Sequence, residues 1–288
     1  MTESKQFRSA AETFGADYEA LANCIPVAHL SIRELDSLLG GVVPGRFTII
    51  GGEPGAGKTS LCNQIKLDLA AQGMTVVYVT YETGTPQLLA KSIAHESEGA
   101  VKVGDVGFTG SEAEKLAISK YHAIAENIIH VSDPVTAAEI FGFVGELRTA
   151  SQTPIALIVD YVQMIPPEQS RIAVDERIRI TESVSVLRRC ANKFGTAVFA
   201  ISSISRGSYS KASTAGLDLL AGAQALEYNA DSVILLSVEG KNEERTANLA
   251  LPVRPVVARF AKNRFGVCGK CKLGFHTDYA TFTARDEL

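Results

Sequence analysis

The chain has 288 residues, of which 46% are hydrophobic and 21% charged, and its formal net charge at pH 7 is −4. This length fits one large domain or two small ones, and the apolar content excludes a disordered chain. With a negative net charge, the protein as a whole does not attract nucleic acid. Nucleic-acid binding would therefore depend on local basic loops, or on a ring of subunits that concentrates their charge. No apolar run reaches the ~18 residues of a membrane span, and residues 1–19 lack a signal-peptide core, so we expect a cytoplasmic protein without membrane contact.

Five cysteines occur at scattered positions: Cys24, Cys62, Cys190, Cys268 and Cys271. An odd, scattered set fits reduced thiols in a cytosolic protein. The last two have the spacing of half a zinc site, but no second pair exists. The sequence therefore favours a turn before a strand over metal or redox use of this pair.

The N-terminal extension, residues 1–29, contains one helical pattern. Phe14, Tyr18 and Leu21 recur at steps of four and three, which predicts a short amphipathic helix. This helix could pack on its own domain or dock on a neighbouring subunit. Residues 30–288 are expected to form the rest of the protein as a single domain.

A phosphate-binding loop of the Walker A type lies at 51–60, which reads GGEPGAGKTS. Its glycines let successive N–H groups face one concavity, Lys58 places a charge on the β- and γ-phosphates, and the Thr59 hydroxyl binds Mg²⁺. An apolar strand at 47–50 and a helix at 59–71 supply the context that distinguishes the motif from a chance glycine-rich turn. The predicted ligands are ATP and Mg²⁺. The predicted nucleotide-binding residues here are Gly52, Glu53, Pro54, Gly55, Ala56, Gly57, Lys58, Thr59 and Ser60.

Two further apolar strands, at 75–81 and 154–160, are each associated with an acid at the carboxyl end. In an open α/β sheet such residues face the ligand crevice. Asp160 is predicted to hold Mg²⁺ beside Thr59, either through water or in the second shell. The alternative for Glu82 and Asp160 is that each caps the element that follows.

The remaining segments alternate between helical and strand patterns. Helices are predicted at 86–97, 111–125, 137–150 and 177–194, and strands at 127–131, 196–202, 230–237 and 255–262, with a final hairpin over 270–275 and 279–283. Ser111 and Glu114 have capping-box spacing. This order predicts one α/β domain with a mostly parallel central sheet flanked by helices and a C-terminal β-hairpin.

Taken together, these motifs resemble the RecA-like P-loop ATPase domain of DnaB-type replicative helicases, from about residue 30 to the C-terminus and without the N-terminal collar domain. The motifs that carry the resemblance are 52–59, Glu82, DYVQ at 160–163, SSISR at 202–206, GAQALEYNAD at 222–231 and AKNRFG at 261–266. Their order and spacing are more specific than the phosphate loop alone.

The resemblance implies roles for four further residues. Glu82 would orient the attacking water. Gln163 would be a further nucleotide-binding residue and would link the nucleotide state to a nucleic-acid loop. Lys262 and Arg264 would form a basic finger that enters the neighbouring subunit's site, although solvated cations at a strand end are the plainer interpretation. A site completed in trans implies a ring or filament, and the resemblance implies a hexamer in head-to-tail arrangement.

Two departures from the family pattern bear on function. Ser203 stands where the family usually has a glutamine that senses the γ-phosphate, and the collar domain that meets the primase is missing. These departures reduce the case for processive unwinding but not for nucleotide binding.

The leading functional hypothesis is an ATP-driven helicase or translocase on single-stranded DNA, with 5′–3′ polarity by family resemblance. Its DNA loops would be 166–176 and 206–219, where Arg206, Tyr209 and Lys211 could hold phosphates and stack a base, unless they form an ordinary solvated loop. The alternative is a RecA-like regulatory or adaptor ATPase whose ATP-dependent assembly recruits a protein partner. A strand-exchange filament is a third, weaker option.

Overall fold

A computed structural model describes residues 9–22, 24–168, 175–203 and 223–285. Its helices are α1 Ala10–Ala22, α2 Arg33–Leu39, α3 Lys58–Ala71, α4 Thr85–Glu96, α5 Glu112–Ile124, α6 Ala137–Ala150, α7 Glu176–Phe194, α8 Ala223–Asn229 and α9 Asn242–Ala250. Its strands are β1 Phe47–Gly52, β2 Thr75–Thr80, β3 Ile128–Val131, β4 Ile155–Asp160, β5 Ala197–Ser203, β6 Ser232–Val238, β7 Val253–Asn263, β8 Lys270–His276 and β9 Thr281–Ala284.

The described strands form one nine-stranded sheet in the order β3-β2-β4-β5-β1-β6-β7-β8-β9. The strands from β3 to β6 pair in parallel, whereas β7, β8 and β9 continue the sheet antiparallel. The predicted fold, a mostly parallel sheet flanked by helices with a C-terminal hairpin, is confirmed. Strands of a parallel sheet that is covered on both faces consist of continuous apolar runs. These runs are the pattern from which the strands were predicted.

Helices cover both faces of this sheet and divide the core in two. Successive residues of a strand point to opposite faces, so Ile49 packs in one cluster and Ile50 in the other. The Ile50 cluster includes residues of α2, α3 and β8, and the Ile49 cluster includes residues of α6, α7 and α8. The sheet is therefore held between two layers, and the carboxyl ends of its parallel strands form one edge where a ligand can bind.

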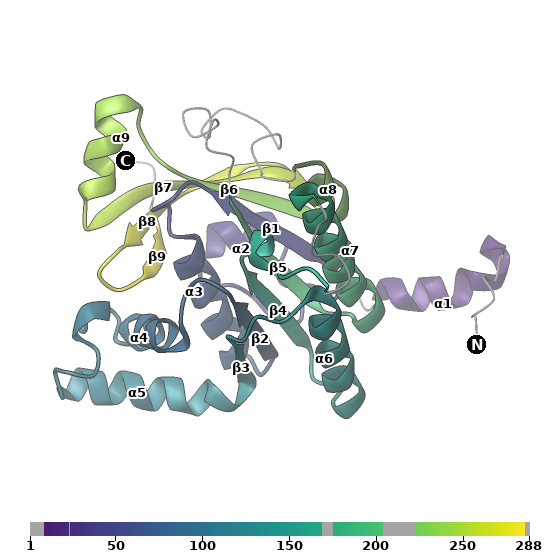
Figure 1. Ribbon diagram of the computed structural model, residues 1–288, viewed down its shortest axis with the longest axis horizontal. Coiled ribbons are helices and arrows are strands. Elements are labelled where there is room, and N and C mark those ends of the chain that lie inside the picture. The colour runs from purple at the N-terminus through teal and green to yellow at the C-terminus, as the bar shows by residue number, and fades with distance from the viewer. Residues whose placement is uncertain (1–8, 23, 169–174, 204–222, 286–288) are drawn as a thin grey trace.

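The N-terminal helix α1 forms as predicted and stands away from the body of the molecule (Figure 1). Phe14, Tyr18 and Leu21 are each 67% exposed, and the first two rings stack on each other with centroids 5.9 Å apart. The alternative in which these three side chains pack on their own domain is therefore wrong for this structure. No helix in the described ranges is long and apolar enough to cross a bilayer.

The helices α2, α8 and α9 were not predicted from apolar periodicity, and the cap of α5 also differs from the sequence-based expectation. Ser111 does cap α5 by accepting a hydrogen bond from the Glu114 N–H, but the Glu114 carboxylate binds the Gly110 N–H and the Thr109 hydroxyl, so the reciprocal half of a capping box is missing. Helix α9, in the connection from β6 to β7, was not predicted. Its sequence, NEERTANLA, is polar and none of its residues is buried, so the apolar periodicity that indicates a helix is absent.

Candidate nucleotide site

The phosphate loop connects β1 to α3 as the motif predicts. Gly57 has φ +87°, and a Cβ atom there would lie 2.6 Å from the Phe282 ring and 3.0 Å from Phe275. Only glycine therefore fits this turn. The Lys58 ammonium donates hydrogen bonds to the carbonyls of Gly52 (2.9 Å) and Glu53 (3.1 Å). Its burial lowers the pKa of Lys58, and the charges of Asp160 and Glu82 oppose that shift.

A cavity of about 420 Å³ opens beside the loop. Among the predicted residues, its wall includes Pro54, Gly55, Gly57, Lys58, Thr59, Ser60, Glu82 and Asp160. The cavity thus brings together the two strand-end acids and the loop, although they come from three different strands. The side chains of Glu53 and Ala56 are buried, and neither these two residues nor Gly52 line the cavity.

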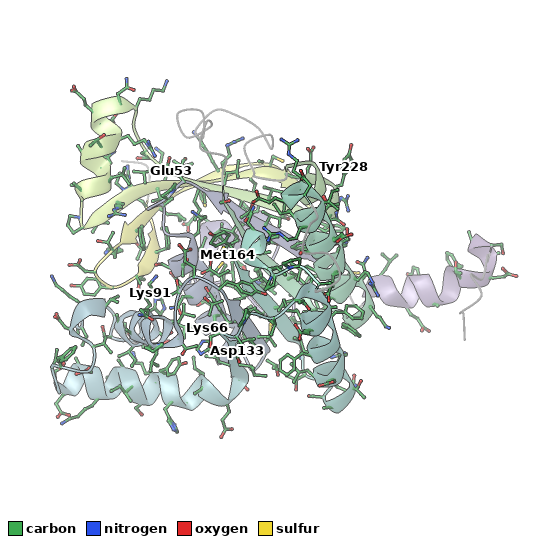
Figure 2. The ribbon with its side chains drawn as sticks, in the orientation of Figure 1. Glu53, Lys66, Lys91, Asp133, Met164 and Tyr228 are labelled. Atoms are coloured by element: carbon green, nitrogen blue, oxygen red, sulfur yellow. The ribbon has the colours of Figure 1, made fainter. Side chains whose placement is uncertain are left out.

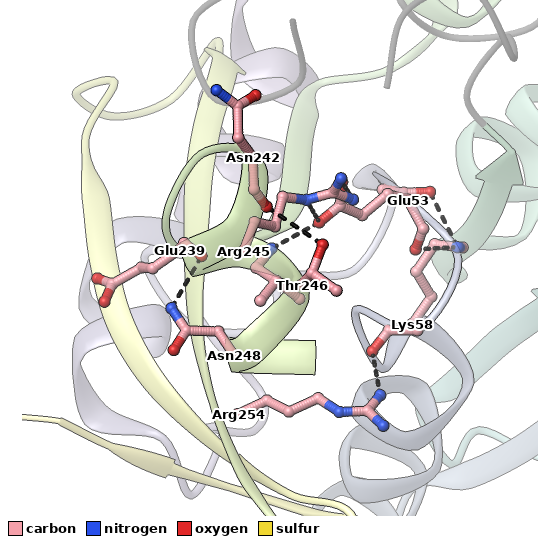
Figure 3. A network of polar contacts seen from close by, with 11 residues as sticks. Glu53, Lys58, Glu239, Asn242, Arg245, Thr246, Asn248 and Arg254 are labelled. Carbon is pink, nitrogen blue, oxygen red and sulfur yellow. Dashed lines mark hydrogen bonds and ion pairs between the residues drawn. The ribbon is translucent and has the colours of Figure 1, made fainter. Parts of the chain in front are cut away.

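Glu53 has a structural partner that the sequence did not reveal. Its carboxylate is 1% exposed, forms an ion pair with Arg245 of α9 and accepts a hydrogen bond from the Val238 N–H at 2.8 Å. Figure 3 shows the Arg245 guanidinium directed at this carboxylate. The Glu53 side chain therefore supports the loop, and the predicted part of Glu53 in nucleotide binding stays a prediction.

Asp160 is the last residue of β4 and lies in the wall of the cavity. It is 1% exposed, accepts a hydrogen bond from the Tyr78 hydroxyl at 3.2 Å and is also bonded to the Thr59 hydroxyl. Burial raises the pKa of Asp160, which the Thr59 and Tyr78 hydrogen bonds oppose. A carboxylate and a hydroxyl are the hard oxygen donors that Mg²⁺ prefers, so these residues fit the predicted ion.

Glu82 is an exposed residue two positions beyond the end of β2. Thr80, the last residue of β2, pairs with Asp160 across the ladder, and this register brings Glu82 to the same end of the sheet. It lines the cavity together with Lys58 and Thr59. A carboxylate that is accessible and close to the phosphate loop can accept a proton from a water molecule there.

Gln163 lies behind the cavity wall. Its side chain is 7% exposed, donates to the Ser202 hydroxyl at 2.8 Å and accepts from the Ser203 N–H at 3.2 Å. Ser203 lines the cavity and Gln163 does not. In this structure Gln163 links the segment after β4 to the end of β5, and its predicted nucleotide contact stays a prediction.

The two predicted finger residues lie near the end of β7, outside the cavity. The Lys262 ammonium donates to the Glu227 carbonyl. The Arg264 guanidinium contacts Asp231 and donates to the Tyr228 carbonyl at 3.1 Å. Neither residue lines the cavity formed by its own chain. The predicted nucleic-acid residues Arg206, Tyr209 and Lys211 lie outside the described residues.

Sequence reasoning missed two basic residues of the cavity wall, Lys91 on α4 and Arg254 on β7. Lys91 is labelled in Figure 2, on the helix that follows Glu82. Burial lowers the pKa of Lys91, and the charges of Asp160 and Glu82 oppose this. A position nine residues after Glu82 on the next helix could have been noticed, but no pattern around Arg254 indicates a ligand.

The cysteines have no arrangement that suggests a metal centre. Cys268 is exposed and Cys271 buried, and none of the five cysteines is joined in a disulfide. Within the described ranges, no group of three or more His, Cys, Asp or Glu side chains could hold a metal ion.

The sequence matches the model of the DnaB-like helicase C terminal domain over residues 29–284. The chain belongs to this family. The replicative DNA helicase DnaB of Mycoplasma genitalium is 25% identical over 261 residues, which is 88% of this chain and 55% of that protein. The DNA repair protein RadA of Pseudomonas aeruginosa is 27% identical over 247 residues, 85% of this chain and 42% of the relative. The chain thus spans about half the length, or less, of these curated relatives.

Solved structures agree with the DnaB-like fold. The ATPase domain of G40P matches with a TM-score of 0.81 and 19% identity, covering 98% of this chain and all of that one. A DnaB-like replicative helicase whose structure was studied with its primase interactions matches with a TM-score of 0.78 and 19% identity, covering 99% of this chain and 69% of that one. The family membership is consistent with the cavity, which contains the predicted loop and both strand-end acids.

Proposed function

We propose that this chain is the ATP-hydrolysing core of a ring-shaped helicase or translocase that acts on single-stranded DNA in the cytoplasm. The observation that carries this proposal is the single cavity lined by Lys58, Thr59, Glu82 and Asp160. These four residues combine a phosphate-binding cation, two oxygen donors for an ion and an accessible base. Positioning and electrostatic stabilisation of this kind provide most of the catalysis of phosphoryl transfer.

In the proposed reaction, the loop N–H groups and Lys58 bind the phosphate oxygens of ATP. Lys58 now donates to two loop carbonyls, and phosphate would replace them as the acceptor. Glu82 orients a water molecule and accepts its proton. Thr59 and Asp160 are the residues that would hold Mg²⁺, which neutralises charge on the phosphates when it is bound.

The basic finger is proposed to act in trans, because Lys262 and Arg264 do not line their own chain's cavity. Delivery of Arg264 to a neighbouring site requires a head-to-tail contact that repeats around a ring, which we propose to be a hexamer. Helix α1 is proposed to dock on a neighbouring subunit as part of the extension 1–29, with the ATPase domain at 30–288. Its three exposed apolar side chains support this assignment.

The proposed DNA contacts are Arg206, Tyr209 and Lys211 and the loop at 166–176, with 5′–3′ movement and a replication or other protein as a partner. Six copies of a weakly basic loop around one channel would concentrate positive charge despite the net charge of −4. Replacement of Arg206 and Lys211 by Ala should reduce stimulation of hydrolysis by DNA and leave basal hydrolysis intact. Unchanged stimulation in this variant would remove the loop from the proposal.

The second candidate is an adaptor ATPase whose assembly is switched by ATP. It is favoured by Ser203, which lines the cavity at the position where the family's glutamine sensor is expected. A serine reaches less far than a glutamine, so nucleotide state would be transmitted less directly to a DNA loop. In this case nucleic acid would not stimulate hydrolysis, and a protein would be the partner.

The deciding experiment measures steady-state ATP hydrolysis by the purified chain with and without single-stranded DNA, with the mass determined by light scattering in the same buffer. Lys58→Ala should abolish binding or turnover, and Glu82→Gln should keep binding but lose hydrolysis. Lys102→Ala is the matched control, because Lys102 is exposed and paired with Asp278 outside the cavity.

If DNA strongly stimulates ATP hydrolysis and the mass is that of a ring, the result supports the helicase or translocase. Unwinding assays on duplexes with 5′ or 3′ tails are then justified. Hydrolysis that is indifferent to DNA supports the adaptor. Absence of nucleotide binding by the wild-type chain contradicts both candidates.

A further inference from the structure

Helix α9 and the start of β7 bring two arginines to the phosphate loop from the side of the antiparallel strands (Figure 3). Arg245 of α9 is paired with the buried carboxylate of Glu53. Arg254, near the start of β7, donates from Nη1 to the Gly55 carbonyl at 2.9 Å. The two contacts differ in kind, because Arg245 has a carboxylate partner, whereas among the described residues Arg254 has only a neutral carbonyl.

Arg254 faces the proposed nucleotide cavity. It lines the wall together with Gly55 and with Phe275, its cross-strand partner on β8. Phe275 stacks on Phe282, with ring centroids 4.6 Å apart, and both rings pack against Gly57. The guanidinium is thus delivered to the loop by a well-packed strand pair rather than by an exposed loop.

Arg254 has hydrogen-bond donors that the described part of the chain does not use. A guanidinium carries five N–H donors, and the Nε–H of Arg254 is buried with no hydrogen-bond acceptor in the described part of the chain. No carboxylate among the described residues lies within ion-pair distance of it. Other described residues also have an unpartnered buried polar atom, but Arg254 is the one that lines this cavity. A buried unpaired donor is costly, so a ligand acceptor is a direct explanation for it.

The charges around the cavity indicate which ligand group fits. Among the described residues, its charged side chains are Lys58, Lys91 and Arg254 against Glu82 and Asp160, so cations exceed carboxylates in this part of the wall. Phosphate oxygens are acceptors that match the planar fork of a guanidinium and can bond two of its donors at once. An adenine or ribose offers no comparable charge.

We propose that Arg254 is a nucleotide-binding residue that contacts the phosphates of ATP or ADP within its own chain. The proposal rests on the proposed function, since it needs a nucleotide in this cavity. It is distinct from the finger residue Arg264, which lies outside the cavity of its own chain. Arg254 would provide a positive charge in cis at a site where Ser203 replaces a longer polar sensor.

The test measures equilibrium affinity by competition with a fluorescent ADP analogue on the full chain. The probes are ADP, a slowly hydrolysed ATP analogue and inorganic tripolyphosphate, which carries phosphates without a base. Arg254→Met keeps side-chain length without the charge. Arg285→Met is the control, because Arg285 pairs with Glu239 at 2.9 Å and does not line the cavity.

We expect Arg254→Met to weaken all three probes by at least about tenfold, the loss typical of one charge-assisted hydrogen bond, while Arg285→Met leaves them unchanged. Arg254→Lys should bind the probes at least about threefold more weakly than wild type. A planar guanidinium can donate to the Gly55 carbonyl and to a phosphate at once, whereas one ammonium cannot. Circular dichroism and thermal midpoints confirm that each variant is folded.

Three results would overturn the assignment. Unchanged affinities in a folded Arg254→Met variant exclude a ligand contact. Weaker ADP binding with unchanged tripolyphosphate binding assigns the contact to the nucleoside. Full wild-type affinity in Arg254→Lys contradicts a contact that depends on the planar fork of the guanidinium. A wild-type chain that binds no nucleotide contradicts the proposed function itself, so the two failures are distinguishable.

Discussion

The Arg264 guanidinium lies 3.3 Å from Oδ1 of Asp231, a carboxylate that is 1% exposed. The same carboxylate accepts a hydrogen bond from the Phe47 N–H at 2.9 Å and pairs with Arg188. Asp231 therefore joins the start of β1, helix α7 and the end of β7. The Arg264 side chain is still 45% exposed, so it is held by its own chain and remains accessible to another.

If Arg264 completes a neighbouring site, two inactive variants should restore activity when they are mixed. Arg264→Ala lacks the finger and Glu82→Gln lacks the base, but a mixed ring contains interfaces where a wild-type finger meets a wild-type base. Hydrolysis at a series of mixing ratios should exceed the sum of the separate variants and pass through a maximum. Additive activity at every ratio would contradict the trans site.

Helix α1 gives a prediction about assembly. Replacement of Phe14, Tyr18 and Leu21 by Ser removes an apolar surface that is exposed in the single chain. If α1 docks on a neighbouring subunit, the mass from light scattering should fall toward 30.7 kDa, the mass of one chain, while thermal stability of the domain changes little. Replacement of the exposed Leu116 on α5 by Ser is the control. An unchanged oligomer in the triple variant excludes α1 from the interface.

Gly57 and Gly73 form a matched pair for testing the phosphate loop. Both have positive φ, +87° and +81°, but a Cβ at Gly57 would lie 2.6 Å from Phe282, whereas nothing lies within 4 Å of one at Gly73. Gly73→Ala should cost about 1 kcal/mol of unfolding free energy from backbone strain alone. Gly57→Ala adds a steric clash and should cost about 2 kcal/mol more, with at least about tenfold weaker ADP binding.

Urea unfolding and ADP affinity of the two variants provide the comparison. Equal stability and equal affinity in Gly57→Ala and Gly73→Ala would contradict the packing of the aromatic pair against the loop. The comparison controls for the left-handed backbone, because both substitutions introduce the same methyl group at a similar φ.

Much of the candidate site could be predicted because its signals are local. The loop motif, the apolar strands and their terminal acids each occupy fewer than about ten consecutive residues, and parallel strands place such ends at one edge. Glu82 and Asp160 therefore meet Lys58 as expected. Arg245 and Arg254 could not be found in this way. Arg245 reaches Glu53 across 192 positions of the sequence, and Arg254 reaches the loop through the register of antiparallel strands.

A buried lysine on the phosphate-loop helix gives a prediction about pH. Lys66 of α3 is fully buried, and its ammonium donates to Asn63 Oδ1 at 2.8 Å and Ser92 Oγ at 2.9 Å (Figure 2). The groups that surround it further out are His130, with Nε2 at 3.5 Å, and the rings of Tyr78 and Tyr121, each with its centroid at 5.8 Å. None of these partners is a carboxylate, and burial lowers the pKa of Lys66 to about 7.

Between pH 7 and the ordinary lysine value of 10.5, the unfolded chain holds a proton on Lys66 that the folded chain has released. Stability therefore rises with pH across this window, by up to about 1.4 kcal/mol per unit, and is lowest below pH 7. Lys66→Met removes this dependence. The free energy of unfolding of the variant should therefore exceed that of wild type most near pH 7 and least near pH 10. Burial also lowers the pKa of His130 to about 4, so its titration lies below the window.

The measurement is the free energy of urea unfolding of the nucleotide-free chain at several values between pH 7 and pH 10. Lys115→Met is the control, because the Lys115 side chain is 62% exposed and its loss should leave the slope unchanged. A Lys66→Met variant with the wild-type slope would show that Lys66 keeps its proton in the folded chain. In that case the hydroxyl and amide oxygens of Ser92 and Asn63, with the two tyrosine rings, would be sufficient to stabilise a buried ammonium.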